Sequence, residues 1–101
     1  MKKSLLLLGV TLNCLAAEPT SVRQAELRHL LKNDCGACHG LTLHGGMGPA
    51  LLPETLKGKP DEFLASTILN GRKGTPMPPW KPFMNADDAH WLVNILRQGP
   101  Q

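Results

Sequence analysis

The sequence predicts a small all-α domain of three to four helices. Segments with apolar residues at helical spacing alternate with loops rich in glycine and proline. The chain has 101 residues, of which 84 follow a predicted signal peptide at 1–17, and a domain near or below about 80 residues usually needs a covalent or metal staple in addition to its apolar core. A Cys-x-x-Cys-His run at residues 35–39 provides the attachment point for such a staple.

This run places Cys35 and Cys38 two small residues apart, with His39 directly after them. The pattern is typical of covalent c-type haem attachment: both thiols form thioethers with the vinyl groups, and the histidine ligates the iron. A zinc half-site would need a second cysteine or histidine pair at compatible spacing. A thioredoxin-like redox pair would need a βαβ context, which this short chain lacks. We therefore predict one haem c, bound through Cys35 and Cys38, with His39 as an axial ligand.

Residues 1–17 have the features of a secretory signal peptide. Two lysines precede an apolar stretch at 5–12, and small residues at 14–17 allow cleavage after residue 16 or 17. The stretch is shorter than the roughly 20 residues that span a bilayer. Retention as an N-terminal anchor and lipid acylation of Cys14 stay open as alternatives. We expect a mature domain of residues 18–101 in the periplasm, with no transmembrane span after processing.

The charge of the chain argues against a nucleic-acid partner. The formal net charge is +3, and removal of Lys2 and Lys3 with the signal peptide lowers it to about +1. Nucleic-acid binding leaves a strongly basic face or tract, and none is evident. We therefore expect no nucleic-acid partner.

The first helix is predicted over residues 22–33. Ser21 and Gln24 have the spacing of a capping box at its start. Helical spacing identifies its core residues as Leu27, Leu30 and Leu31. His29 is expected on the exposed face of this helix.

The glycine-rich segment after His39 is predicted to be a loop. A haem-ligating histidine usually donates its second ring N–H to a carbonyl group, and Gly48 or Pro49 offers one to His39. His44 and Met47 lie in the same loop and remain alternative ligands, although loop surface or haem packing is the favoured interpretation of both.

A short helical turn within residues 51–56 precedes a clearer second helix. We place Pro60 at the first helical position, followed by acidic residues that suit the helix dipole. The helix is expected to end at Asn70–Gly71. Its apolar side consists of Phe63, Leu64, Ile68 and Leu69.

Prolines on both sides of Met77 exclude a regular helix or strand and predict a stiff loop. A thioether sulfur is a neutral, soft iron ligand, and His/Met ligation raises the reduction potential. We predict Met77 as the sixth ligand. Met84 is its main rival, but it directly precedes the last helix and is expected to pack in the core. Trp80 is predicted to pack against the haem.

The last helix is predicted from its cap, Asn85, to about Gln98, with Asp88 at the third helical position. Gly99 and Pro100 stop it. His90 is expected at the surface. The helix should cross the first one and pack Leu92 and Leu96 on Leu27 and Leu31.

With these elements in place, the chain resembles the class I monohaem cytochromes c over nearly all of its mature length. The resemblance rests on CGACH, GGMGPAL, ILNGRKG and TPMPPW. It implies a fold in which crossing terminal helices enclose one covalent haem, with Pro49 providing the carbonyl that orients the axial histidine. Within the family, the chain looks most like the small periplasmic cytochromes associated with dissimilatory nitrite reductase of the haem c/haem d type.

That resemblance implies a non-enzymatic one-electron carrier in denitrification, which serves nitrite reductase or the maturation of its haem d. The alternative is a haem enzyme or gas-binding protein with a labile sixth ligand. No acid–base pair near the distal loop is evident to support that alternative. Basic residues are expected to frame the haem edge and to dock an acidic partner, or to form ordinary surface: Lys57, Arg72, Lys73 and Lys81. A dimer that exchanges the segment carrying Met77 also stays open.

Overall fold

The computed structural model describes residues 17–99. Along the chain they form α1 (Ser21–Leu30), the π-helical segment η1 (Leu31–Cys35), α2 (Gly36–His39), α3 (Pro53–Leu56), α4 (Asp61–Asn70) and α5 (Ala86–Gln98). No strand occurs in this part of the chain, so the predicted all-α class is confirmed. The predicted signal peptide lies outside the described residues, Ala17 excepted, and so does the alternative acylation site Cys14.

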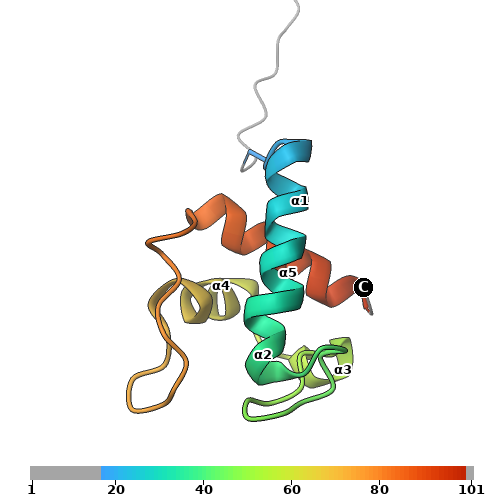
Figure 1. The fold of residues 1–101 in the computed structure, drawn as a ribbon, viewed down its shortest axis with the longest axis vertical. Helices are drawn as coiled ribbons and strands as arrows, with labels where there is room; N and C mark the ends of the chain where they lie inside the picture. Colours follow the sequence, from blue (N-terminus) through green and yellow to red (C-terminus); the bar gives the residue numbers. More distant parts are fainter. Residues whose placement is uncertain (1–16, 100–101) are drawn as a thin grey trace, which may run out of the picture.

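Three consecutive elements, α1, η1 and α2, form one nearly continuous rod that crosses α5, as Figure 1 shows. The rod starts one residue earlier than predicted. Thr20, not Ser21, is the N-cap, and its hydroxyl accepts a hydrogen bond from the backbone N–H of Arg23. The expected capping box does not form, because the Gln24 side chain donates to the carbonyl of Pro19 instead.

The expected end of the first helix was also wrong. The α-helix ends at Leu30, and the chain continues as a π-helical turn to Cys35 and then as a further α-helical turn to His39. The side chain of Asn33 donates to the carbonyl of His29 across this transition. Short π-helical turns of this kind occur often at functional sites, and here the turn ends at the first residue of the Cys-x-x-Cys-His run.

The core lies where the rod crosses α5. Leu27 has an exposed fraction of 0% and Leu92 of 1%, and Leu31 and Leu96 belong to the same buried cluster. This is the helix crossing that the sequence predicts. At the edge of the crossing, the Arg28 guanidinium lies 5.3 Å from the centre of the Trp91 ring.

The helix α4 packs along α5 and forms the opposite side of the fold (Figure 1). Pro60 is its N-cap and not, as predicted, its first helical residue, while Asp61 and Glu62 occupy the first turn. Arg97 of α5 holds the connection between α3 and α4, because its guanidinium donates to Asp61 and to the carbonyls of Leu56 and Lys59.

The start of α5 has the predicted cap. Asn85 accepts a hydrogen bond of 2.8 Å from the Asp88 N–H, and the Asp88 carboxylate accepts one of 3.2 Å from the Asn85 N–H. Met84, just before this cap, is buried in the core as expected. Among residues 17–99, no helix combines the length and the apolar character of a membrane span.

Candidate haem site

A cavity of about 580 Å³ opens between the rod, α4 and α5. Its volume falls within the roughly 300–1,000 Å³ that is usual for ligand and cofactor sites. Helices and the loop before α3 contribute apolar side chains to its walls, among them Leu31, Leu51, Leu56, Leu64, Ile68 and Leu92. Cys35, Cys38, His39, Pro49, Met77 and Trp80 all line it as well, so the fold brings every predicted site residue to one cavity.

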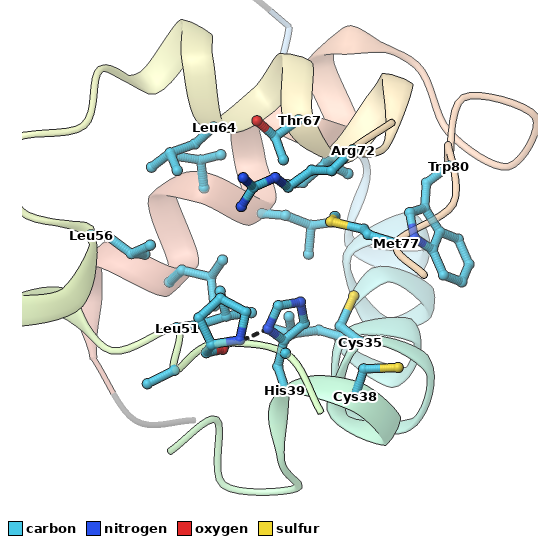
Figure 2. A pocket seen from close by; sticks show the side chains of 18 of the residues that line it. Cys35, Cys38, His39, Leu51, Leu56, Leu64, Thr67, Arg72, Met77 and Trp80 are labelled. Atoms are coloured by element: carbon cyan, nitrogen blue, oxygen red, sulfur yellow. Dashed lines mark hydrogen bonds between the residues drawn. The ribbon is translucent and has the colours of Figure 1, made fainter. Parts of the chain in front are cut away.

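His39 lies on one side of the cavity, at the end of α2 (Figure 2). Its Nδ1 atom donates a hydrogen bond of 2.6 Å to the carbonyl of Pro49. This bond selects Pro49 from the two carbonyls considered in the sequence. Because Nδ1 carries the donated proton, Nε2 keeps the lone pair that a metal ligand needs.

Gly48 lets the loop approach this ring. A Cβ atom at position 48 would lie 2.8 Å from Cε1 and 2.9 Å from Nδ1 of His39. Carbon atoms in ordinary contact are about 3.5–4.0 Å apart, so no larger residue fits without moving the ring or the loop. The loop itself is held against α2, because the Gly48 N–H donates a hydrogen bond of 2.7 Å to the carbonyl of Cys38.

The two cysteines lie on the rod, one at the end of η1 and one within α2. Figure 2 shows both thiols at the same end of the cavity. Burial raises the pKa of the Cys35 thiol to about 11, and the nearby Asp34 adds to this effect. Cys35 is therefore a neutral thiol in the unattached chain. A thioether has no ionisable proton, so this shift concerns the precursor alone.

Met77 faces the cavity from the side opposite His39 (Figure 2). It lies in the segment between α4 and α5, residues 71–85, which we call the distal loop. Gly71 begins the loop with a φ of 70°, and a Cβ atom there would lie 2.7 Å from the Met77 carbonyl oxygen. That carbonyl accepts a hydrogen bond from the Arg72 N–H, and the Arg72 carbonyl in turn accepts one from the Thr75 hydroxyl.

The other proposed ligands lie in different surroundings. His44 is exposed, and its Nδ1 atom contacts the carbonyl and hydroxyl oxygens of Thr42. Met84 is buried in the core away from the cavity lining. Met47 does line the cavity, but 79% of it is exposed. Met77 thus combines a position at the cavity with a loop held by its own hydrogen bonds.

Two other residues of the distal loop contribute to the cavity. Trp80 lines it and packs its ring 5.8 Å from that of Phe83. Arg72 was expected to frame the haem edge; the residue is exposed, and its guanidinium extends into the cavity (Figure 2). Lys73 and Lys81 are exposed and are not part of the lining. The sequence signal for Arg72 was its place directly after the helix-ending Gly71, on the chain that leads to Met77.

These features together fit a covalently attached haem. The cavity is large and mainly apolar, and both thiols lie at one end of it. A nitrogen donor and a thioether sulfur face it from opposite sides. In c-type cytochromes that ligate iron through histidine and methionine, these two atoms are the axial ligands.

Comparisons with known proteins agree with this chemistry. Residues 22–94 match the family model described as "Cytochrome C oxidase, cbb3-type, subunit III". The "Cytochrome c55X" of Pseudomonas aeruginosa is 60% identical over 81 residues, which cover 80% of this chain and 68% of that protein. The chain belongs to the cytochrome c55X family. It is a c-type cytochrome with one covalent haem c, and it serves as an electron carrier.

Two solved structures resemble this cytochrome. The structure titled "c-type cytochrome NirC" is 61% identical, with a TM-score of 0.78, and the match covers 79% of this chain and 94% of that one. The structure titled "Dihydro-heme d1 dehydrogenase NirN in complex with DHE" is 37% identical, with a TM-score of 0.66. That match covers 72% of this cytochrome but only 16% of the dehydrogenase. The first of these matches confirms the predicted cytochrome c fold.

Proposed function

We propose that this cytochrome is a periplasmic one-electron carrier, and not an enzyme, whose haem c is bound by Cys35 and Cys38 and ligated by His39 and Met77. The observation that carries the proposal is the placement of His39 and Met77 on opposite sides of one cavity. When bound there, haem c supplies a one-electron ferric/ferrous couple. If His39 and Met77 both ligate the iron, no open position would remain for a substrate, which suits a carrier.

The chain's own residues would keep this couple in a fixed environment. The Pro49 carbonyl orients the His39 ring through the 2.6 Å hydrogen bond. The hydrogen bonds around Arg72, Thr75 and Met77 limit the movement of the distal loop. Apolar side chains from α4 and α5 line the cavity and would keep the bound group in apolar surroundings. A rigid site of this kind changes little between its two oxidation states, so electron exchange needs little rearrangement.

The partner that we propose is dissimilatory nitrite reductase or the machinery that makes its haem d1. The relative named "Dihydro-heme d1 dehydrogenase" from Pseudomonas aeruginosa contains a stretch 34% identical to this chain, which covers 93% of this cytochrome and 19% of that protein. Oxidation of a dihydro-haem to the haem releases two electrons and two protons. A carrier with a single haem would accept those electrons in two successive encounters, with the protons released to solvent.

The proposed location follows from the N-terminal sequence. We propose that residues 1–17 act as a signal peptide and that residues 18–101 form the mature periplasmic domain. The comparison of mature and translated protein masses tests this directly, since the mature mass should equal that of residues 18–101 (or 17–101) plus one haem. Retention of the full mass, or a mass increase from lipid on Cys14, would contradict it.

Rapid mixing of the reduced cytochrome with its partner tests the functional proposal. We expect the ferrous protein to be oxidised within milliseconds to seconds by nitrite reductase turning over nitrite, and not by nitrite alone. In a second experiment, dihydro-haem d1 dehydrogenase and its substrate should reduce the ferric protein. Oxidation by nitrite in the absence of a partner, or fast binding of carbon monoxide by the ferrous protein, would instead favour a haem enzyme or gas-binding protein.

A further inference from the structure

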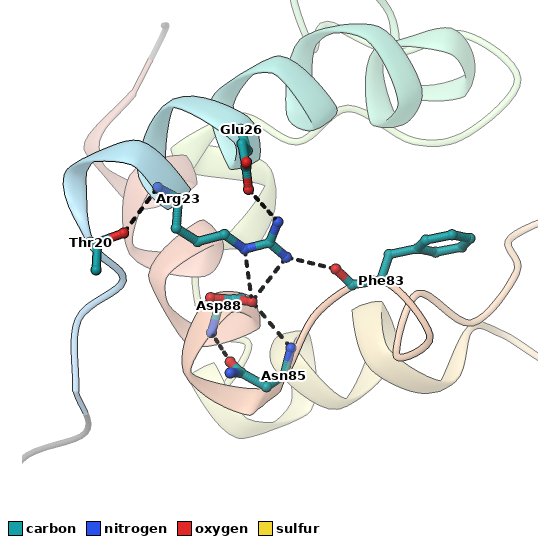
Figure 3. Close-up of polar contacts among 6 residues, drawn as sticks. All are labelled: Thr20, Arg23, Glu26, Phe83, Asn85 and Asp88. Atoms are coloured by element: carbon teal, nitrogen blue, oxygen red, sulfur yellow. Dashed lines mark hydrogen bonds and ion pairs between the residues drawn. The ribbon is translucent and has the colours of Figure 1, made fainter.

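Arg23, on α1, connects its own helix to the end of the distal loop and the start of α5, which lie 60 to 65 residues further along the chain (Figure 3). Its Nε and Nη2 atoms donate to one carboxylate oxygen of Asp88, at 3.2 and 3.1 Å. Nη2 also donates to the carbonyl of Phe83, at 2.6 Å. Nη1 donates to Glu26 one turn further along α1, at 2.9 Å. One guanidinium thus binds the end of the distal loop, the start of α5 and its own helix.

The partners of Arg23 differ in burial. The Asp88 side chain is only 8% exposed, whereas that of Glu26 is 59% exposed. Asp88 is also held by the cap of α5, because its carboxylate accepts the Asn85 N–H. The contacts to Asp88 and Phe83 therefore fix the guanidinium against a rigid surface, while an exposed ion pair such as the one with Glu26 contributes little.

The Phe83 carbonyl belongs to the part of the distal loop that reaches the cavity. The Phe83 N–H donates a hydrogen bond of 2.8 Å to the carbonyl of Trp80, and this bond closes a turn. Trp80 itself lines the cavity. On its other side this turn is tied to α4, because the N–H groups of Trp80 and Lys81 donate to the carbonyls of Ile68 and Leu69. The loop that carries Met77 is thus anchored to α4 by its backbone and to α1 by Arg23.

Arg23 lies on α1, the first element of the rod that carries the haem-attachment residues. The rod that begins with α1 continues through η1 and α2 to Cys35, Cys38 and His39. We propose that Arg23 is a positioning residue that holds the distal loop against this rod and so keeps Met77 in place opposite His39. The inference rests on the proposed His39/Met77 ligation. It adds a residue outside the cavity lining that controls the position of Met77.

The chemistry of the side chain explains why arginine is needed here. A guanidinium presents five donors in a fixed plane, whereas the lysine ammonium is a single point with three donors. Lysine at position 23 is expected to keep a charge pair with Asp88 but to lose the second contact, with the Phe83 carbonyl. Arg23→Lys should therefore show an intermediate effect, which a role in charge alone would not produce.

The test uses the holoprotein and measures access to the iron. We expect the ferrous Arg23→Ala variant to bind carbon monoxide about tenfold faster than wild type or more, because the loss of a hydrogen bond from a charged donor favours loop opening by at least that factor. Its reduction potential should fall together with the faster binding. Arg23→Lys should lie between the two proteins, and it serves as the test variant if Arg23→Ala does not yield holoprotein.

Two control variants separate positioning from stability. Glu26→Ala removes the exposed partner of Arg23, and Thr20→Ala removes the cap of the same helix. Both should leave carbon monoxide binding and the potential at wild-type values, even where the melting temperature falls. If the Arg23 variants change only the melting temperature, as Thr20→Ala does, the inference is overturned and the proposed function stands. If wild type binds carbon monoxide as fast as Met77→Ala, both the ligation and the inference fail.

Discussion

The Nδ1 atom of His39 lies 2.6 Å from the carbonyl oxygen of Pro49, ten residues further along the chain. The loop between them returns to α2 closely enough that position 48 has no room for a Cβ atom. The orientation and tautomer of the His39 ring therefore depend on the path of the loop that carries Gly48 and Pro49.

The first prediction concerns this close approach. Gly48→Ala should lower the fraction of protein that carries haem and should displace the His39 ring, because overpacking of this kind costs about 1–3 kcal/mol. The haem content, measured as the pyridine haemochrome per protein, and the reduction potential report the change. Gly58→Ala is the control: its φ of 83° strains an alanine there, but a Cβ atom at position 58 meets nothing within 4 Å and the residue is outside the cavity lining, so it reports backbone strain without overpacking of the ring. Equal haem content in both variants would refute this account of Gly48.

Removal of the proposed sixth ligand gives the second prediction. Met77→Ala should lower the reduction potential by roughly a hundred millivolts or more, within the ~0.8 V range that axial ligands span, and should let the ferrous protein bind carbon monoxide. Met47→Ala is the matched control, because Met47 also lines the cavity but is 79% exposed. A change in the absorption spectrum with Met47→Ala and none with Met77→Ala would reverse the assignment.

The third prediction compares two neighbouring cations. Both residues are exposed, but the Arg72 guanidinium extends into the cavity, whereas Lys73 lies outside its lining. A positive charge near the haem favours the ferrous state, so Arg72→Ala should lower the potential by roughly 30–60 mV, where 59 mV is a tenfold change for one electron. Lys73→Ala should change it much less, and only at low ionic strength. Equal shifts for the two variants would place Arg72 among the ordinary surface charges.

A fourth prediction concerns pH and the contact between α4 and α5. His90 contacts two acceptors, because Nδ1 lies 2.8 Å from the Ala86 carbonyl oxygen and Nε2 lies 2.8 Å from a carboxylate oxygen of Glu62. Both contacts are satisfied only when the ring is protonated. The bond to Ala86 and then the one to Glu62 raise the pKa of His90 above 6.5. The stabilisation is therefore complete below pH 6.5 and is lost as the pH rises through the higher folded-state pKa.

Thermal unfolding of wild type and His90→Gln from pH 5 to pH 9 measures this effect. The two melting temperatures should differ most at the acidic end and converge as the pH rises above 7, and Glu62→Gln should reduce the pH dependence. Since the Glu62 side chain is 86% exposed, the difference should be small. A difference that grows with pH would contradict the assigned sign.

Much of the fold was predictable because its signals are local. The cap of α5 at Asn85, the burial of Met84 and the crossing of Leu27 with Leu92 follow from helical spacing and short-range capping patterns. The start of α1 was harder, because Thr20 and Ser21 are both good capping residues and the backbone selects between them. The path through η1 was not predictable, since nothing in the periodicity distinguishes a π-helical turn from the end of a helix.

The site was predictable in its residues and less so in its surroundings. Covalent attachment of haem requires the spacing of Cys35, Cys38 and His39, so this motif can be recognised from the sequence alone. By contrast, Arg23 forms hydrogen bonds with Phe83 and Asp88, which lie 60 and 65 residues further along the chain. No local sequence pattern predicts such a contact. The inward direction of Arg72 likewise depends on the path of the distal loop, which Gly71 starts with a left-handed backbone conformation.

The π-helical turn η1 limits where this chain can accept an inserted residue. Each added residue in a helix rotates the downstream part of that helix by about 100°. One residue gained within Leu31–Cys35 and accommodated as regular helix would therefore turn both sulfur atoms and the imidazole away from the cavity together, even if every side chain that lines the cavity were kept. The number of residues between Leu30 and Gly36 thus sets the direction of all three attachment side chains, and an insertion there should abolish maturation where most point substitutions would not.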